Sequence, residues 1–178
     1  MSTPQVYVAC LAAYNAGKLH GDWADATDEH EIIETIERVI ESSPVEDAEE
    51  HAFHDYDGFG KAGDVLGEYS SAEDVASLGA LVETHGADLV GAAAENWGPS
   101  NPGNVVGTVE DLIENNYHGE YSSVGDYAHE YYESTGELDK VPSSLRYHID
   151  WESVGKEMET GGLTALDAPG GKVYIFSE

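Results

Sequence analysis

Basic residues are the scarcest functional group in this 178-residue chain, which has seven Lys and Arg against 36 Asp and Glu, for a net charge of −29. Proteins that bind DNA or RNA need a basic face that displaces counterions from phosphates. The shortage of cations therefore excludes direct nucleic-acid binding, and it disfavours anionic membranes in the same way. Such a charge favours a basic partner, of which the nucleic-acid groove of another protein is the commonest large example.

Cysteine and long apolar runs are also scarce. Cys10 is the only cysteine, which excludes an intrachain disulfide and fits a reducing compartment. No apolar run approaches the roughly 20 residues of a transmembrane helix. The first residues, MSTPQVYVAC, lack the basic and apolar pattern of a signal peptide. We therefore expect a soluble cytoplasmic protein.

Sequence motifs of catalysis and cofactor binding are absent. The chain has no Gly-x-Ser-x-Gly elbow, no phosphate loop and no dinucleotide fingerprint. Among 36 carboxylates, a pair at the spacing that glycosidases use arises by chance and carries no information. We predict no catalytic residues, no cofactor and no metal site, and so no enzyme.

The segment HAFHDYDG (51–58) is the strongest candidate against that view, because it groups His51, His54, Asp55 and Asp57. In a strand, His54 and Asp55 face opposite sides, and His51 and Asp57 lie about 20 Å apart. The following DYDGFGKAGD does not keep the order of a calcium-binding EF-hand loop. We interpret the segment as a structural strand whose aspartates add negative surface. A small acidic hydrolase that uses His51, His54 and Asp55 is the alternative.

Local patterns predict an α+β fold, arranged as an elongated chain of three small domains. The predicted domains are an N-terminal α+β domain (1–69), a helical middle domain (70–114) and a C-terminal α+β domain (115–178). Apolar or alternating runs predict strands, and cap residues before apolar stripes predict helices. The predicted strands are 5–13, 51–56 and 172–177, and the predicted helices cover 28–42, 71–85, 89–97 and 108–114, with further helices beginning after Ser123 and Asp150 and a helical turn at 142–148.

A short repeat marks two of these helix starts. GEYSSAEDVA (67–76) and GEYSSVGDYA (119–128) share their first five residues and a later Asp and Ala. We interpret the repeat as one capping sequence used twice. Duplication of a whole domain is the weaker interpretation, because the flanking residues do not match.

The acids are distributed along the chain. Residues 62–139 hold 16 acids and no Lys or Arg, and residues 19–60 hold 14 acids with Arg38 as the one cation. This pattern predicts a folded protein with a long negative surface, not a disordered acidic tail. Several tyrosines also gather beside acids between residues 117 and 132, where they form either an ordinary helix face or a protein interface.

Four segments together resemble the ArdA family of antirestriction proteins. They are YVACLAAYNAGKLHGDW (7–23), HAFHDYDGFG (51–60), LGEYSS (66–71) and YYESTGELDKVPSSLRYHIDWESVGKEME (131–159). The last segment is the most specific, because its Tyr-Tyr, Glu-x-x-Gly, Val-Pro-x-x-Leu and Tyr-x-Ile-Asp elements keep the family order.

The resemblance implies a function without catalysis. Proteins of this family are carried largely by mobile genetic elements, and they mimic duplex DNA in the DNA groove of type I restriction–modification enzymes. They have three small domains in a row and pair into a homodimer through the C-terminal domain. The segment that resembles their antirestriction motif includes Leu138, Val141, Pro142, Leu145, Tyr147, Ile149 and Asp150.

We assign two further groups of residues on this basis. The acidic surface that meets the partner is expected at Glu110, Asp111, Glu114, Glu120, Asp126, Glu130, Glu133, Glu137 and Asp139. The dimer contact is expected at or near Tyr117, Tyr121, Val124 and Tyr127. The alternative function is an acidic inhibitor or chaperone of another basic DNA-binding protein, with much of the charge due to a salt-rich host.

Overall fold

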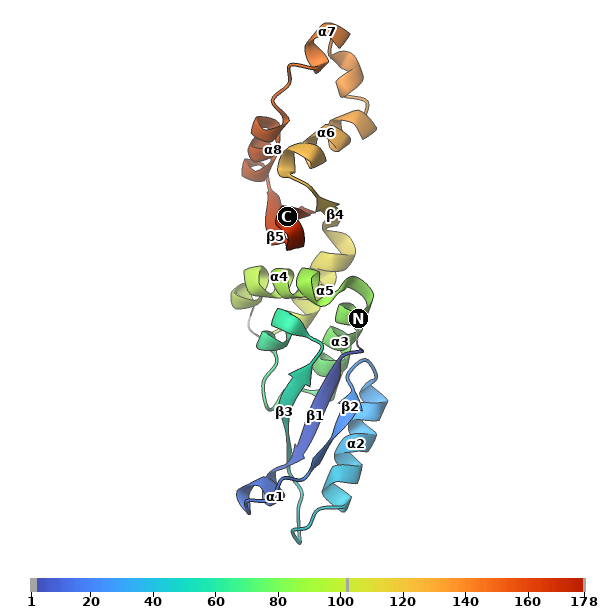
Figure 1. Ribbon diagram of the computed structural model, residues 1–178, viewed down its shortest axis with the longest axis vertical. Coiled ribbons are helices and arrows are strands. Elements are labelled where there is room, and N and C mark those ends of the chain that lie inside the picture. The colour runs from blue at the N-terminus through green and yellow to red at the C-terminus, as the bar shows by residue number, and fades with distance from the viewer. Residues whose placement is uncertain (1–2, 102, 178) are drawn as a thin grey trace. The chain divides into compact units, whose positions relative to one another are not determined.

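The computed structural model describes residues 3–101 and 103–177, and the chain forms two compact units, 1–110 and 111–178. Each unit contains a three-stranded antiparallel sheet and helices packed beside it (Figure 1). The predicted α+β class is therefore confirmed. The division into three domains stays a prediction.

The first unit combines a sheet with a group of helices. Its elements are β1 (Gln5–Cys10), α1 (Leu11–Asn15), β2 (Gly21–Asp25), α2 (Glu29–Glu41), β3 (His51–Asp57), η1 (Gly60–Val65), α3 (Ala72–His85), α4 (Ala87–Trp97) and η2 (Gly98–Ser100). Helix α5 (Val105–Asn115) crosses the boundary to the second unit.

The second unit is smaller and has a different order, in which one strand is followed by helices and then by a pair of strands. Its elements are β4 (Tyr117–Tyr121), α6 (Val124–Ser134), η3 (Leu138–Lys140), α7 (Ser143–Arg146), α8 (Trp151–Thr160), β5 (Leu163–Ala168), η4 (Pro169–Gly171) and β6 (Lys172–Ser177).

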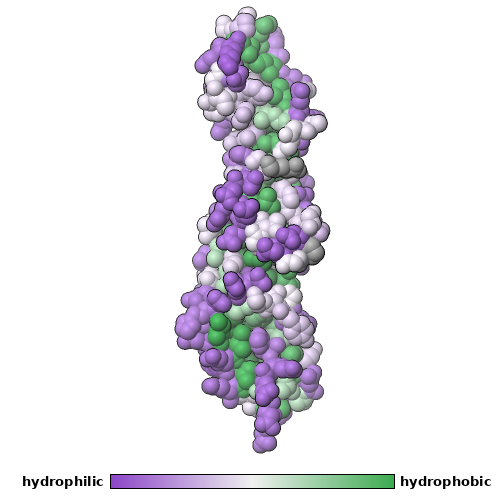
Figure 2. All heavy atoms as spheres, turned by 180° about the vertical axis from the view of Figure 1, so that it is seen from behind, coloured by the Kyte–Doolittle hydropathy of each residue, from purple (hydrophilic) through white to green (hydrophobic). Residues whose placement is uncertain are grey.

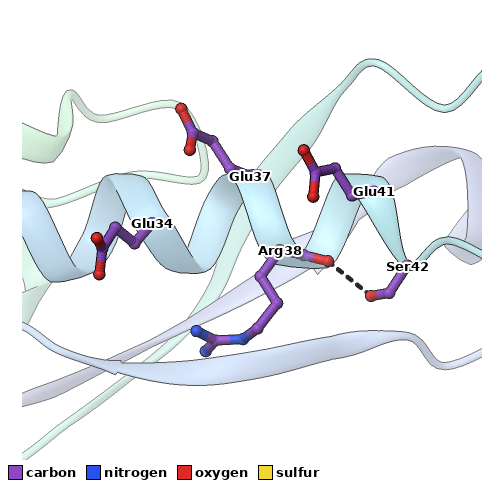
Figure 3. Close-up of a pocket in the computed structure, with 5 residues that line it drawn as sticks. All are labelled: Glu34, Glu37, Arg38, Glu41 and Ser42. Atoms are coloured by element: carbon purple, nitrogen blue, oxygen red, sulfur yellow. Dashed lines mark hydrogen bonds between the residues drawn. The ribbon is translucent and has the colours of Figure 1, made fainter.

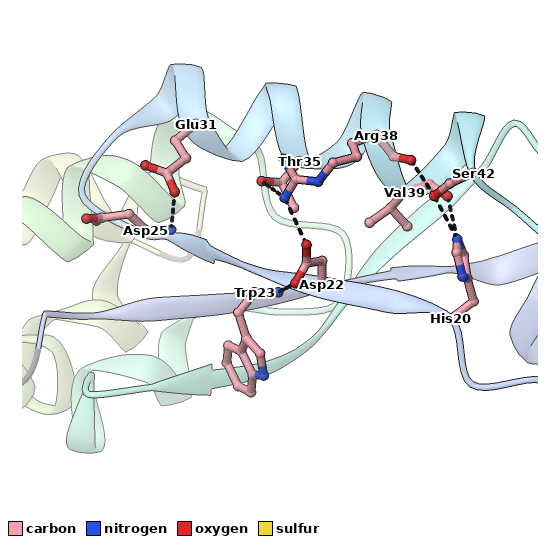
Figure 4. A network of polar contacts seen from close by, with 9 residues as sticks. All are labelled: His20, Asp22, Trp23, Asp25, Glu31, Thr35, Arg38, Val39 and Ser42. Atoms are coloured by element: carbon pink, nitrogen blue, oxygen red, sulfur yellow. Dashed lines mark hydrogen bonds and ion pairs between the residues drawn. The ribbon is translucent and has the colours of Figure 1, made fainter.

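Strand β1 forms the centre of the first sheet, whose order is β2-β1-β3. Its residues Val6 and Val8 are fully buried, and α2 packs against β1 and β2. Polar contacts complete this packing (Figure 4). Arg38 Nη2 donates to Asp22 Oδ2 at 3.0 Å and to Thr35 Oγ1 at 3.2 Å, and His20 Nε2 lies 2.9 Å from the Val39 carbonyl oxygen.

HAFHDYDG forms strand β3, as predicted, but its side chains do not alternate strictly. Tyr7 pairs with Asp55 whereas Val8 pairs with Phe53, so His54 is an extra residue in a β-bulge. As a result His54 and Asp55 are both exposed, and the buried Phe53 enters the core. The His54 ring packs edge-on against Tyr14 at 4.8 Å between centroids. These contacts fit the structural interpretation of the segment.

Helices α6 and α8 cover one face of the second sheet, whose order is β4-β6-β5. Val124 and Tyr127 of α6 pack with Leu163 of β5 and Ile175 of β6 in the core. The two helices approach closely at Gly155, where a Cβ atom would lie 2.6 Å from the Val124 carbonyl oxygen. Glycine at this position therefore sets the distance between α6 and α8.

The strand predicted over 5–13 is too long. It ends at Cys10, and residues 11–15 form helix α1. Asp28 caps α2, because its carboxylate accepts from the backbone N–H of His30. Strands β2, β4 and β5 were not predicted.

Candidate partner-binding surface

The nine acids assigned to the partner-binding surface are all exposed. Helix α5 carries three of them, β4 one, α6 three, and the residues around η3 the last two. In chain order they are Glu110, Asp111, Glu114, Glu120, Asp126, Glu130, Glu133, Glu137 and Asp139.

Three of the nine acids are neutralised by cations of the same unit. Glu120 pairs with Lys172 at 2.6 Å, Glu137 with Lys140 at 2.5 Å, and Asp139 with Arg146 at 3.2 Å. The remaining six, Glu110, Asp111, Glu114, Asp126, Glu130 and Glu133, form no ion pair within residues 3–101 and 103–177. The free negative charge of this surface therefore lies mainly on α5 and α6.

The first unit carries even more charge, with 22 acids against three cations, compared with 14 against four in the second. Helix α2 shows how the first unit presents its negative charge, because Glu34, Glu37, Arg38 and Glu41 line a shallow hollow on its surface (Figure 3). Glu37 and Glu41 point away from the sheet, whereas Arg38 reaches towards β2 (Figures 3 and 4). The cation is used inside the unit, and the glutamates are left to solvent.

Three of the residues that resemble the antirestriction motif line a groove of about 400 Å³ in the second unit. Leu138, Val141 and Ile149 line one part of it. The other part comes from α6 and α8 through Tyr132, Trp151, Val154 and Glu157, with Glu137 and Lys140 also in the lining. Three of the predicted motif residues thus share one partly apolar site.

The other motif residues have different roles. Leu145 and Tyr147 are exposed, with 54% and 92% of their surface accessible, and hydrophobic residues reach the surface near α7 (Figure 2). Pro142 precedes α7 as its N-cap residue. Asp150 caps α8, and hydrogen bonds from the hydroxyl and backbone N–H of Ser153 lower the pKa of its carboxyl.

The four residues predicted for the dimer contact do not form one exposed surface. Val124 and Tyr127 are buried in the core of the second unit, and Tyr121 packs against that core. Tyr117 lies on the opposite side of β4, where its ring contacts Tyr174 and Phe176. Burial raises the pKa of Tyr117 to about 12, as expected for a phenol removed from water. The dimer contact itself stays a prediction.

Sequence patterns left several residues of this site unassigned. Helix α8 extends the negative surface with three exposed acids, Glu152, Glu157 and Glu159. The sequence could have indicated them, because they lie on the polar side of a helix that it already predicts. The groove residues Tyr132, Trp151 and Val154 lie in the segment 131–159 that resembles the family, but nothing in their spacing assigned them to a groove. The local cations Lys140 and Arg146 had a signal, because they follow two acids within ten residues.

Metal-binding groups were sought among the described residues, 3–101 and 103–177. Within the part of the chain that the structure describes, no group of three or more His, Cys, Asp or Glu side chains could hold a metal ion. His51 is half-buried, and desolvation lowers the pKa of its imidazole. Among these same residues, no helix has both the length and the apolar content to span a bilayer.

These features indicate the class of protein, which is an acidic α+β protein that presents exposed carboxylates and a partly apolar groove. The chain belongs to the ArdA family of antirestriction proteins. The model of that family, described as antirestriction protein (ArdA), matches residues 6–168, nearly the whole chain. No curated protein matches the sequence. Family membership implies an antirestriction function that is directed at restriction enzymes, exerted by an inhibitor protein.

Proposed function

We propose that this protein is a DNA mimic that occupies the DNA groove of a type I restriction–modification enzyme and blocks it. The observation that carries the proposal is the set of six exposed carboxylates on α5 and α6 without ion pairs among the described residues. A basic groove that binds phosphates attracts such a negative surface, and it repels surfaces that are themselves positively charged. The acids of α2 and α8 extend the same chemistry.

The quantity of charge supports a mimic of several turns of duplex. Two copies of the chain carry twice its net charge of −29. Duplex DNA carries one charge per about 1.7 Å of axis, so the pair matches roughly 100 Å of DNA. Carboxylates held on folded elements also avoid the cost of bending, which is about 1–6 kcal/mol for a site of 20–30 base pairs.

We further propose that the functional form is a homodimer that meets through the second unit. Two chains of this charge repel each other unless they meet where charge is balanced. Strands β4 and β6 meet that condition, because Glu120 of β4 is paired with Lys172 of β6. The dimer contact is then at or near the residues predicted for it, Tyr117, Tyr121, Val124 and Tyr127.

A second function has one observation in its favour. The acids are as dense on the first unit as on the second, which is also the pattern of adaptation to a salt-rich host. In that case the protein inhibits or chaperones another basic DNA-binding protein, and part of its charge serves solubility. Equally acidic composition in unrelated proteins of the same genome supports this alternative.

Competition with DNA tests the proposed function. We expect the purified protein to displace labelled duplex from the methyltransferase core of a type I enzyme at near-stoichiometric amounts, at low and at moderate salt. The matched control carries Glu110→Gln, Glu114→Gln, Glu130→Gln and Glu133→Gln, which keep side-chain size and remove four charges. Its displacement is expected to weaken. Failure of the unaltered protein to displace DNA at either salt concentration contradicts the proposal.

A further inference from the structure

Residues 138–149, called here the motif loop, have no core of their own. Neither η3 nor α7 contains a buried residue. The backbone hydrogen bonds of the loop are short-range, as from Val141 N to Leu138 O and from His148 N to Leu145 O, and each spans only three residues. Such bonds shape single turns, but they do not fix the first turn relative to the second.

Arg146 makes the contacts that join the two turns. Its Nε donates to the Val141 carbonyl oxygen at 2.9 Å, and its Nη2 donates to the Asp139 carbonyl oxygen at 3.1 Å. Its Nη1 donates to Asp139 Oδ1 at 3.2 Å. Two of the three acceptors are backbone atoms, so the guanidinium follows the path of the chain and not only the charge of one carboxylate.

The ion pair alone does not account for this arrangement. The Asp139 side chain is 82% accessible, whereas that of Arg146 is 33% accessible. Water screens an exposed carboxylate, so this pair contributes little to stability. A planar guanidinium with its donors in a fixed fork holds several acceptors in one geometry, which the single ammonium of lysine cannot do.

We propose that Arg146 is a positioning residue for inhibition: its guanidinium holds 139–141 against α7 so that the groove and the exposed Leu145 and Tyr147 are already arranged before the restriction enzyme binds. This proposal rests on the proposed function. Preorganisation of this kind removes the ordering cost that a loose loop pays on binding. Arg146 therefore acts through the shape of the motif loop and contributes no negative charge.

Lys61 provides a matched comparison, because it lies outside the groove and the nine assigned acids, and its ion pair joins it only to the Glu95 side chain, at 2.9 Å. Arg146→Ala and Lys61→Ala each make the chain more acidic by one charge. If charge alone determined inhibition, the two changes would have the same small effect, in the favourable direction for a basic groove. A positioning role predicts instead that only the change at Arg146 weakens inhibition.

The test measures inhibition of a type I enzyme, thermal unfolding and fast hydrogen exchange of backbone amides on the full chain. We expect Arg146→Ala and Arg146→Lys to raise the half-inhibitory concentration about tenfold, by loss of hydrogen bonds from a charged donor. The unfolding temperature should stay within experimental error, and amide exchange in 138–149 should rise. Lys61→Ala should inhibit as the unaltered protein does.

Each outcome has one meaning. Full inhibition by Arg146→Lys, or equal effects of Arg146→Ala and Lys61→Ala, overturns the positioning role. A fall in inhibition that is matched by a fall in unfolding temperature also overturns it, because the role would then be structural. If the unaltered protein does not inhibit at all, the proposed function fails, and the exchange data on the free chain alone decide whether Arg146 orders the loop.

Discussion

At the scale of single residues, Gly155 decides how closely α6 and α8 approach. A Cβ atom there would lie 2.6 Å from the carbonyl oxygen of Val124, a backbone atom that cannot move by itself. In an isolated helix, exchange of glycine for alanine is favourable by about 1 kcal/mol. The sign in this protein should be reversed by the contact.

We predict that Gly155→Ala lowers the free energy of unfolding by about 1–3 kcal/mol, the usual cost of overpacking. Urea unfolding followed by circular dichroism measures the change. Gly67→Ala is the control, because a Cβ atom at Gly67 meets nothing within 4 Å. A stability of Gly155→Ala equal to or above that of the unaltered protein would show that the helices separate freely at this point.

At the scale of elements, sequence predicted helices better than strands. Ser71, Ser123 and Asp150 accept hydrogen bonds from backbone N–H groups at the starts of α3, α6 and α8, as their capping patterns indicated. The central strands β1 and β6 are apolar and were also predicted. Strand β2, with the sequence GDWAD, lies at a sheet edge, where one side of the strand faces solvent and little hydrophobic pattern is required.

The repeated GEYSS sequence allows a comparison of two equivalent caps. Ser71 and Ser123 each cap a helix, but the Ser71 hydroxyl donates to Asp74 of its own helix, whereas the Ser123 hydroxyl donates to Glu152 of α8. Ser71→Ala should cost about 1 kcal/mol, the usual value of a lost cap. Ser123→Ala should cost more, because it also removes the link between α6 and α8. Denaturant unfolding of both variants gives the comparison, and equal costs would mean that the link to Glu152 adds no stability.

At the scale of the whole molecule, the sequence predicted which acids are exposed, but it did not predict which of them form ion pairs. Exposure followed from composition, since carboxylates are almost never buried without a partner. The pairing of Glu120 with Lys172 depends on the contact of β4 with β6, residues 52 positions apart, so no local pattern reports it. The tyrosines illustrate the same limit, because helical spacing suits a core face and an interface equally. In strand β4, moreover, a bulge places Tyr117 and Tyr121 in different contacts, which no local pattern predicts.

Net charge leads to the last prediction, which separates mimicry from adaptation to salt. Added salt shortens the screening length, which is about 10 Å at 0.1 M, and so weakens repulsion among the acids within each chain. The same screening weakens attraction to a basic groove. Between about 0.05 M and about 0.5 M NaCl, we expect the unfolding temperature to rise while direct binding to the restriction enzyme weakens.

Thermal unfolding and isothermal titration calorimetry across the same salt series measure the two slopes. The variant with Glu110, Glu114, Glu130 and Glu133 changed to Gln should give a shallower slope in both, because fewer charges are screened. A rise in unfolding temperature with no change in binding would assign the charge to salt tolerance alone. Opposite slopes that shrink together in the variant would show that the same carboxylates destabilise the free chain and attract its partner.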